Sequence, residues 1–244
     1  MKKTLIKIYI SAIISILVFS GCFNESNNID HFLLANQKYD AGYYNEAIEL
    51  YSKVIEKNPD FQTAYFYRAS SKYAIKDYFG AMEDYTSVIE IDSNNNLAFN
   101  SRGISKTQLG MYKEAILDYD MSLNLNPFDS ESYNNRGYAY FLLADYESAL
   151  EDYNKAVDLT PDILGYRYNL AIAKSKNGDY QGALDDLSLI IEKNDSNYNN
   201  FIERGNVYFK MQRFYKACAD WKTAEKLGSK EAVKLLNEKC IDNY

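Results

Sequence analysis

Few residues of this chain have the type and spacing that catalysis or metal binding requires. The only histidine, His31, is far in the sequence from Cys218 and Cys240, so these residues form no zinc-ligand motif. No glycine-rich phosphate loop, HExxH or GxSxG motif is present. Adjacent acids such as Glu151 and Asp152 do not face each other on a helix. We therefore expect no enzyme, no metal site and no cofactor, and interpret His31 as a surface or end-packing residue.

Cys218 and Cys240 leave two interpretations open. In an oxidising compartment they could form a disulfide near the carboxyl end, which would stabilise the fold by about 3 kcal/mol. Alternatively, they are two small buried thiols of the kind common in helical cores. The sequence alone does not decide between these interpretations.

The elements that position these residues follow a repeat of 34 residues. Ala149, for example, returns in every unit. Its counterparts are Ala47, Ala81, Ala115, Ala183 and Ala217. Six units fill residues 28–231 without insertion or deletion, with bounds 28–61, 62–95, 96–129, 130–163, 164–197 and 198–231. A fixed period of this length indicates a stacked-repeat protein.

Each unit contains two helix patterns. In the fourth unit, apolar and small residues recur at spacings of three and four over residues 133–143 and again over 146–157. A short turn separates the two patterns, and several units carry glycine there, which commonly ends a helix. Pro161 cannot continue the second helix. The pattern predicts an all-α chain of helix-turn-helix units, with small residues such as Ala149 where two helices approach closely.

The fourth unit resembles the tetratricopeptide repeat in its aromatic, small and proline residues. The matching residues are Tyr133, Gly137, Tyr140, Ala149, Tyr153, Ala156 and Pro161. The resemblance covers all six units and implies a right-handed α-solenoid of six 34-residue helix-turn-helix repeats plus a C-terminal capping helix. The departures are Ser93, Asp195 and Ser229 in place of the proline, and Lys76 and Gln212 in place of the turn glycine.

The capping helix is expected at residues 230–240, where it begins in the last two residues of the sixth repeat, and residues 232–244 are assigned to this helix and a tail. Its residues Ala232, Leu235, Leu236 and Cys240 face inward in a helical pattern. Lysines and other polar residues occupy the opposite face. Such a helix solubilises the exposed end of a repeat stack.

Charged residues recur with the same period. One site of the first helix carries Arg68, Arg102, Arg136 and Arg204, and one site of the second carries Asp84, Asp118, Asp152, Asp186 and Asp220. In an antiparallel hairpin the two sites lie at similar heights, so we expect an ion pair within each unit. The fifth unit lacks the arginine at this site but has Arg167 one turn away. We interpret these pairs as structural.

The resemblance also implies a concave groove, lined by the first helices, that binds peptide segments of partner proteins. The groove residues would be Asn36, Tyr39, Phe66, Ser70, Tyr73, Asn100, Thr107, Asn134, Asn135, Tyr138, Phe141, Tyr168, Asn169, Ile172, Asn206 and Phe209. Asparagine can both donate to and accept from peptide amides, and aromatic rings supply contact area at low entropic cost. Because these sites are mostly neutral, a clamp for a terminal carboxylate is not expected. The alternative is that asparagine and tyrosine reflect the residue usage of an AT-rich genome.

The amino terminus has the features of an export signal. Lys2 and Lys3 precede an apolar run over residues 8–19, which is too short to span a bilayer as a permanent helix. Small residues then lead to Cys22. The segment resembles a bacterial lipoprotein signal, which implies that residues 1–21 are removed, Cys22 is acylated and residues 22–27 form a linker. Phe19 departs from the usual Leu, Val or Ile, so an ordinary cleaved signal or a retained anchor stays an alternative.

Removal of residues 1–21 would change the formal net charge from −7 to −10, because three lysines and no acid are lost. An acidic chain repels phosphate backbones, so nucleic-acid binding is not expected. The sequence therefore favours an exported, lipid-anchored scaffold of a bacterial cell envelope that binds other proteins. The alternative is a binding component of an envelope uptake or assembly system, for example in glycan uptake or pilus secretin assembly.

Overall fold

The computed structural model describes residues 29–240, which are divided between two compact units, 29–110 (unit 1) and 111–240 (unit 2). The predicted signal segment, Cys22 and the linker lie outside the described residues. Within 29–240 the chain is helical and contains no strand. This confirms the all-α prediction.

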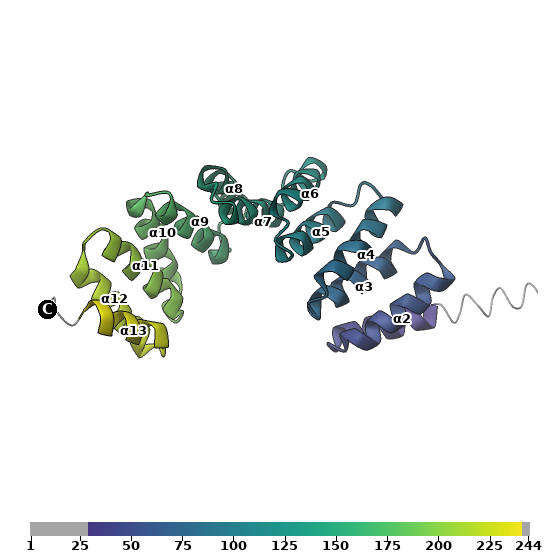
Figure 1. Ribbon diagram of the computed structural model, residues 1–244, viewed down its shortest axis with the longest axis horizontal. Coiled ribbons are helices and arrows are strands. Elements are labelled where there is room, and N and C mark those ends of the chain that lie inside the picture. Colours follow the sequence, from purple (N-terminus) through teal and green to yellow (C-terminus); the bar gives the residue numbers. More distant parts are fainter. Residues whose placement is uncertain (1–28, 241–244) are drawn as a thin grey trace, which may run out of the picture. The chain divides into compact units, whose positions relative to one another are not determined.

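Unit 1 is a stack of antiparallel helices coloured purple to teal in Figure 1. They are the helix of residues 29–40, α2 (Tyr44–Lys57), α3 (Gln62–Ala74), α4 (Tyr78–Ile91) and α5 (Asn96–Gln108). From α2 to α5, each helix packs on the next helix in the chain. This nearest-neighbour packing is what a repeat architecture requires, because no single hairpin buries its apolar face alone.

Unit 2 continues the pattern in green and yellow (Figure 1). Its helices are α6 (Tyr112–Leu125), α7 (Ser130–Leu142), α8 (Tyr146–Leu159), α9 (Leu164–Lys176), α10 (Tyr180–Lys193), α11 (Tyr198–Lys210), α12 (Phe214–Lys226) and α13 (Lys230–Lys239). Consecutive helices again pack together. In addition, the first helices of neighbouring repeats touch, α7 with α9 and α9 with α11. None of the described helices is long and apolar enough to cross a membrane.

Every repeat turns between its two helices through one residue with positive φ. These residues are Gly42 (78°), Lys76 (66°), Gly110 (77°), Ala144 (60°), Gly178 (90°) and Gln212 (58°). A left-handed residue after a helix lets the chain reverse while the last carbonyls still accept hydrogen bonds. The three residues other than glycine adopt the same geometry, so these departures from the repeat pattern leave the hairpin unchanged.

Small and large residues alternate in the core. The alanine shared by all repeats is fully buried in each of them. Four residues later on the same helix lies a large buried residue, which is a tyrosine in four repeats, Leu187 in the fifth and Trp221 in the sixth. Rings of this size pack against small residues of the first helix, such as glycine. A Cβ added at Gly205 would lie 2.5 Å from Nε1 of Trp221, whereas one added at Gly137 would lie 3.1 Å from the Tyr153 ring.

The predicted ion pairs form in the second, fourth, fifth and sixth repeats. Arg68, Arg136 and Arg204 each donate two hydrogen bonds, of 2.7–2.8 Å, to the aspartate of the same repeat. Arg167 pairs with Asp186 at 2.8 Å. Each of the first three arginines also reaches the preceding repeat, for example Ser52 from Arg68 at 3.0 Å. One guanidinium therefore ties together three helices, and the sequence analysis had not anticipated the third.

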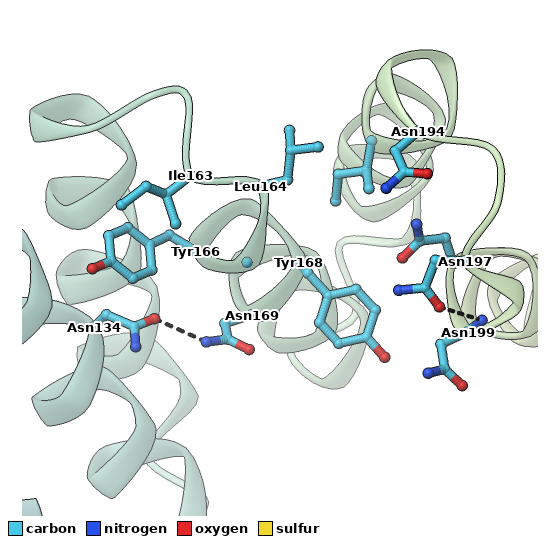
Figure 2. A pocket seen from close by; sticks show the side chains of 12 residues that line it. Asn134, Ile163, Leu164, Tyr166, Tyr168, Asn169, Asn194, Asn197 and Asn199 are labelled. Carbon is cyan, nitrogen blue, oxygen red and sulfur yellow. Dashed lines mark hydrogen bonds between the residues drawn. The ribbon is translucent and has the colours of Figure 1, made fainter. Parts of the chain in front are cut away.

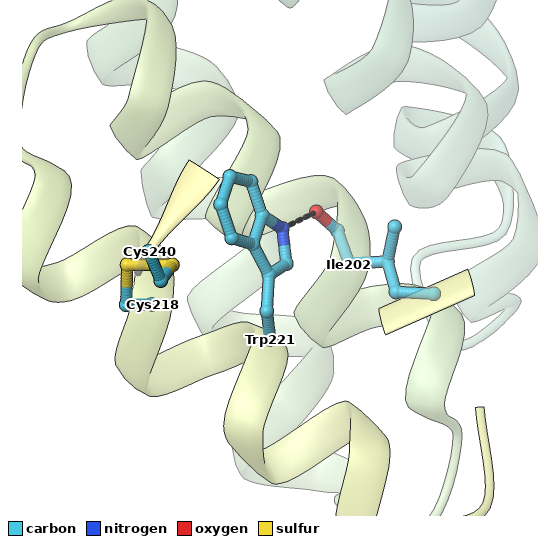
Figure 3. Close-up of a disulfide and its surroundings, with 4 residues drawn as sticks. All are labelled: Ile202, Cys218, Trp221 and Cys240. Atoms are coloured by element: carbon cyan, nitrogen blue, oxygen red, sulfur yellow. Dashed lines mark hydrogen bonds between the residues drawn. A yellow bond between two sulfur atoms is a disulfide. The ribbon is translucent and has the colours of Figure 1, made fainter. Parts of the chain in front are cut away.

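The capping helix α13 closes unit 2. Ala232 is buried, and Leu235 and Leu236 pack against the same cluster as Trp221. Cys240 forms a disulfide with Cys218 of α12, which answers the question that the sequence left open (Figure 3). The indole N–H of Trp221 donates to the carbonyl oxygen of Ile202 at 3.4 Å (Figure 3).

Candidate functional site

The inner face of unit 2, defined here as the side formed by α7, α9, α11 and the end of α13, contains three adjoining cavities. The first and second share Tyr168 and Asn169, and the second and third share Ile172 and Glu203. They therefore follow one another along the unit. Two hydrogen bonds fix the spacing of the helices, from Asn169 to Asn134 (2.8 Å) and from Lys210 to Ser175 (3.1 Å).

The first cavity is rich in amides and has a volume of about 450 Å³. Asn134 of α7 and Asn169 of α9 lie on neighbouring helices, and the side-chain amide of Asn169 donates a hydrogen bond to the side-chain oxygen of Asn134 (Figure 2). Tyr168 points into the same space (Figure 2). Burial raises the pKa of Tyr168 to about 12, and nearby Glu203 and Glu231 add to the rise. Its hydroxyl therefore stays protonated and can donate, and the amides can both donate and accept, as recognition of an extended peptide requires.

The second cavity is smaller, about 210 Å³, and mostly apolar. Tyr138 and Phe141 of α7 and Ile172 of α9 line it, and buried Tyr153 contributes its ring. Tyr138 is 43% exposed, so its ring is accessible from solvent. A cavity of this size and lining suits one apolar side chain of a bound segment.

The third cavity has a volume of about 420 Å³ and a different chemistry. It is lined by Lys176, Lys210 and Lys239, together with Glu203, Asn206 and other residues. Burial lowers the pKa of Lys210, the charge of Lys176 lowers it further, and Glu203 opposes both. The two lysines are thus close enough to repel each other.

The inner face of unit 1 is arranged differently. The hydroxyl of Tyr51 donates to Asn36 at 2.7 Å, and Ser70 and Tyr85 share a hydrogen bond of 3.0 Å. The predicted aromatic groove residues of this unit pack on other rings, as Phe141 and Phe209 of unit 2 also do on Tyr146 and Phe214. The pairs of unit 1 are Tyr39 with Tyr44 and Tyr67, Phe66 with Tyr67 and Tyr85, and Tyr73 with Tyr78. These side chains support the core of unit 1.

The structure thus separates the predicted groove residues that line cavities from those that do not. Eight of them line the three cavities of unit 2: Asn134, Tyr138, Phe141, Tyr168, Asn169, Ile172, Asn206 and Phe209. Asn135 accepts a 3.5 Å hydrogen bond from Asn134 without lining a cavity described here. Asn100 and Thr107 are buried, with exposed fractions of 5% and 7%.

Two sets of cavity residues were missed by the sequence analysis. The first is the asparagine cluster around the loop before α11, which consists of Asn194, Asn197, Asn199 and Asn200. The second is the set of lysines, because Lys210 follows the predicted groove residue Phe209 by one position, Lys176 follows Ser175, which was not predicted, and Lys239 lies on the capping helix. The density of asparagine between residues 194 and 200 was the available signal for the first set.

Residues 29–240 contain no group of histidine, cysteine or acidic side chains that could hold a metal ion. His31 has a buried Nδ1 without a hydrogen-bond partner in this part of the chain. Nothing in its surroundings assigns it a chemical role.

The tetratricopeptide repeat family matches residues 32–96 and, separately, residues 130–163. No curated protein matches the sequence. Several solved structures share the fold. PilF of Pseudomonas aeruginosa is 19% identical, with a TM-score of 0.73 over 88% of this chain and 99% of its own. A tetratricopeptide repeat protein of Parabacteroides merdae is 20% identical, with a TM-score of 0.69 over 87% and 98%.

YrrB, described as a tetratricopeptide repeat protein with an unusual peptide-binding site, is 21% identical. Its TM-score is 0.65 over 78% of this chain and 97% of its own. At these identities the likenesses concern the fold. Together with the consecutive helix pairs they show an all-α solenoid fold, and tetratricopeptide repeats are matched at residues 32–96 and 130–163.

Proposed function

We propose that this protein is a membrane-tethered scaffold that binds segments of partner proteins along the inner face of unit 2. The observation that carries the proposal is the coincidence of two independent results. Eight residues expected in a peptide-binding groove line three adjoining cavities. The cavities differ in chemistry, and this order of amide, apolar and charged sites suits one extended segment.

The tether is inferred from the amino terminus alone. Lys2 and Lys3, the apolar run and Cys22 support export and acylation, and an envelope location would follow from both. Two further findings agree with this proposal. The disulfide between Cys218 and Cys240 suits an oxidising compartment, in which such bonds persist. The likeness to YrrB, whose structure is described by its peptide-binding site, supports peptide binding.

The proposal is tested by crosslinking in membranes, capture of the full-length chain and identification of the captured proteins. Asn134→Ala and Tyr138→Ala should each reduce capture of the same partners several-fold while changing the free energy of unfolding by no more than about 0.5 kcal/mol. The matched controls are Asn154→Ala on the exposed side of α8 and Tyr215→Ala, 72% exposed on α12, which should leave capture unchanged. Unaltered capture by the first two variants would refute the groove assignment.

The tether has its own test. Fractionation of cells that produce the wild type or Cys22→Ala should move the variant from the membrane to the soluble fraction, because the lipid provides the attachment. Equal membrane association of both proteins would show that acylation at Cys22 does not hold the chain there, without affecting the groove assignment.

A further inference from the structure

The outward side of α6 carries a row of exposed apolar side chains; the helix is labelled in Figure 1. Leu117, Met121 and Leu125 follow one another at intervals of four residues, with exposed fractions of 64%, 43% and 37%. Residues four apart lie on the same face of a helix, one turn after another. Phe128, in the turn that follows α6, is 78% exposed. We call these four side chains the α6 stripe.

The two most exposed positions of the α6 stripe carry different residues in the other repeats. Four of the five counterparts of Leu117 are acidic and the fifth is an alanine, and all counterparts of Phe128 are polar. The counterparts are Glu49, Glu83, Glu151, Asp185 and Ala219 for Leu117, and Asp60, Asn94, Asp162, Ser196 and Lys230 for Phe128. All of these residues are exposed. Packing within the repeats therefore does not account for Leu117 and Phe128, and an apolar patch at solvent-facing positions indicates a contact surface.

The charges of α6 argue against a lipid surface as the occupant of the stripe. The helix contains one cation, Lys113, and three acids. Asp118 is buried, Asp120 pairs with Arg136, and Glu114 is exposed. A helix that lies on a membrane carries several lysines and arginines on its polar face, where they attract anionic lipid. An apolar protein surface therefore fits the α6 stripe better.

We propose that the α6 stripe binds the same stripe of a second copy of this chain, in an antiparallel contact with two-fold symmetry. The order of the stripe favours this partner, because Leu117 and Leu125 are each four residues from Met121. With the axis at Met121, Leu117 of each copy meets Leu125 of the other, and the two Met121 side chains meet on the axis. Phe128 of one copy then lies beside Lys113 of the other, whose ammonium group the ring attracts.

The size of the stripe sets the strength of the contact. It exposes on the order of 400 Å² of apolar surface per copy. Burial on both copies, together with the polar rim, comes to about 1,000 Å², at the lower limit of specific interfaces. We therefore expect a weak dimer with a dissociation constant of about 10 µM. The inner face of unit 2 is formed by other helices and stays open, so one dimer presents two inner faces to partners.

Cysteine crosslinking tests the register. In the full-length chain with Cys22→Ala, Met121→Cys should form covalent dimers with a short bismaleimide, several-fold more than Lys155→Cys does. Lys155 is the matched control, because it is exposed at the equivalent position of α8. A mixture of Leu117→Cys and Leu125→Cys copies should form more dimer than either variant alone.

Sedimentation velocity in detergent measures the association. The Cys22→Ala chain should convert from monomer to dimer as its concentration passes about 10 µM. Leu117→Glu should raise the dissociation constant at least about tenfold, because each contact would bury a carboxylate. It should melt like the parent chain below the dissociation constant, because three other repeats carry glutamate at this position. Leu189→Glu changes an exposed leucine of α10 outside the stripe and should leave the association unaltered.

The same measurements can overturn the proposal. A monomer at every concentration, or equal crosslinking of Met121→Cys and Lys155→Cys, would refute the contact. Species larger than the dimer would mean an open head-to-tail contact in place of the two-fold one. Crosslinks in whole cells that join Met121→Cys to a different protein, without a homodimer, would assign the stripe to another partner. Binding to phosphatidylglycerol vesicles that is lost only in Leu117→Glu would assign it to a lipid surface.

Discussion

One position of the first helix, repeated every 34 residues, contributes to the core in unit 1 and to cavities in unit 2. In unit 1, Asn36 and Ser70 hydrogen-bond to Tyr51 and Tyr85 of the core. In unit 2, the equivalent residues of the last three repeats line cavities instead. These residues are Tyr138, Ile172 and Asn206.

The cause lies in the large core residue that each inner-face residue meets. A buried tyrosine hydroxyl needs a hydrogen-bond partner, and in unit 1 the first helix supplies it. In the fifth repeat the core residue is Leu187, which needs none, and in the sixth the Trp221 N–H is satisfied by the carbonyl oxygen of Ile202. In the fifth and sixth repeats the change in the core therefore leaves Ile172 and Asn206 available for binding, whereas the fourth repeat keeps Tyr153 and Tyr138 lines the second cavity beside it.

The largest difference between the units is expected from their buried carboxylates. Asp84→Asn in unit 1 leaves both Arg68 and Lys72 without a counter-ion, so we expect a loss of about 3 kcal/mol in the free energy of unfolding. Asp152→Asn in unit 2 should cost about half as much. Arg136 keeps its 2.6 Å ion pair with Asp120, and burial already raises the pKa of Asp152 against its charged form.

Urea denaturation of each variant, followed by amide hydrogen exchange, measures both losses and assigns them to α3–α4 or to α7–α8. Equal losses would contradict the view that Asp120 gives unit 2 a second counter-ion.

The sequence was sufficient to predict the elements of the fold because those elements depend on local and periodic signals. The alanine at each helix contact and the arginine–aspartate pairs recur every 34 residues, and a repeat contacts mainly its neighbours. The turns were also predictable, although Lys76, Ala144 and Gln212 adopt a left-handed geometry that their residue types do not favour.

The site was predicted only in part. Its residues recur at one position of the 34-residue repeat, but whether the residue at that position is available for binding differs between repeats. Whether a first-helix residue is available depends on one opposing side chain, so Asn36 and Asn206 look alike in the sequence. Lys239 could not be assigned, because its place depends on how the capping helix docks. The disulfide that fixes this docking was one of two interpretations at that stage.

An intermediate effect is expected from the same substitution in both units. Asn36→Ala leaves the hydroxyl of fully buried Tyr51 without its acceptor, so it should cost about 1–2 kcal/mol. Asn206→Ala removes a side chain at the edge of an open cavity together with its hydrogen bond to the partly exposed Glu203, and should cost less, about 0.5–1 kcal/mol. Thermal and urea unfolding measure both. The loss for Asn36→Ala should largely vanish in a Tyr51→Phe background, and a loss that persists there would assign it to helix propensity.

The smallest effect is a dependence on pH that arises from Glu203 of unit 2. At the register where unit 1 stacks Tyr67 on Tyr51, with ring centroids 6.1 Å apart, unit 2 places Glu203. Burial raises the pKa of Glu203 in the folded chain, so the folded state binds its proton more tightly than the unfolded state does. Its contribution to stability is present below the ordinary carboxyl pKa and is lost as pH rises through the folded value.

At pH 7, Glu203→Gln should therefore be more stable than the wild type, by less than about 1 kcal/mol. Urea titrations at pH 7 and pH 4 test this, because the advantage of the variant should disappear at the lower pH. An advantage that grows on acidification would mean that Lys176 and Lys210 stabilise the charged carboxylate more than burial penalises it.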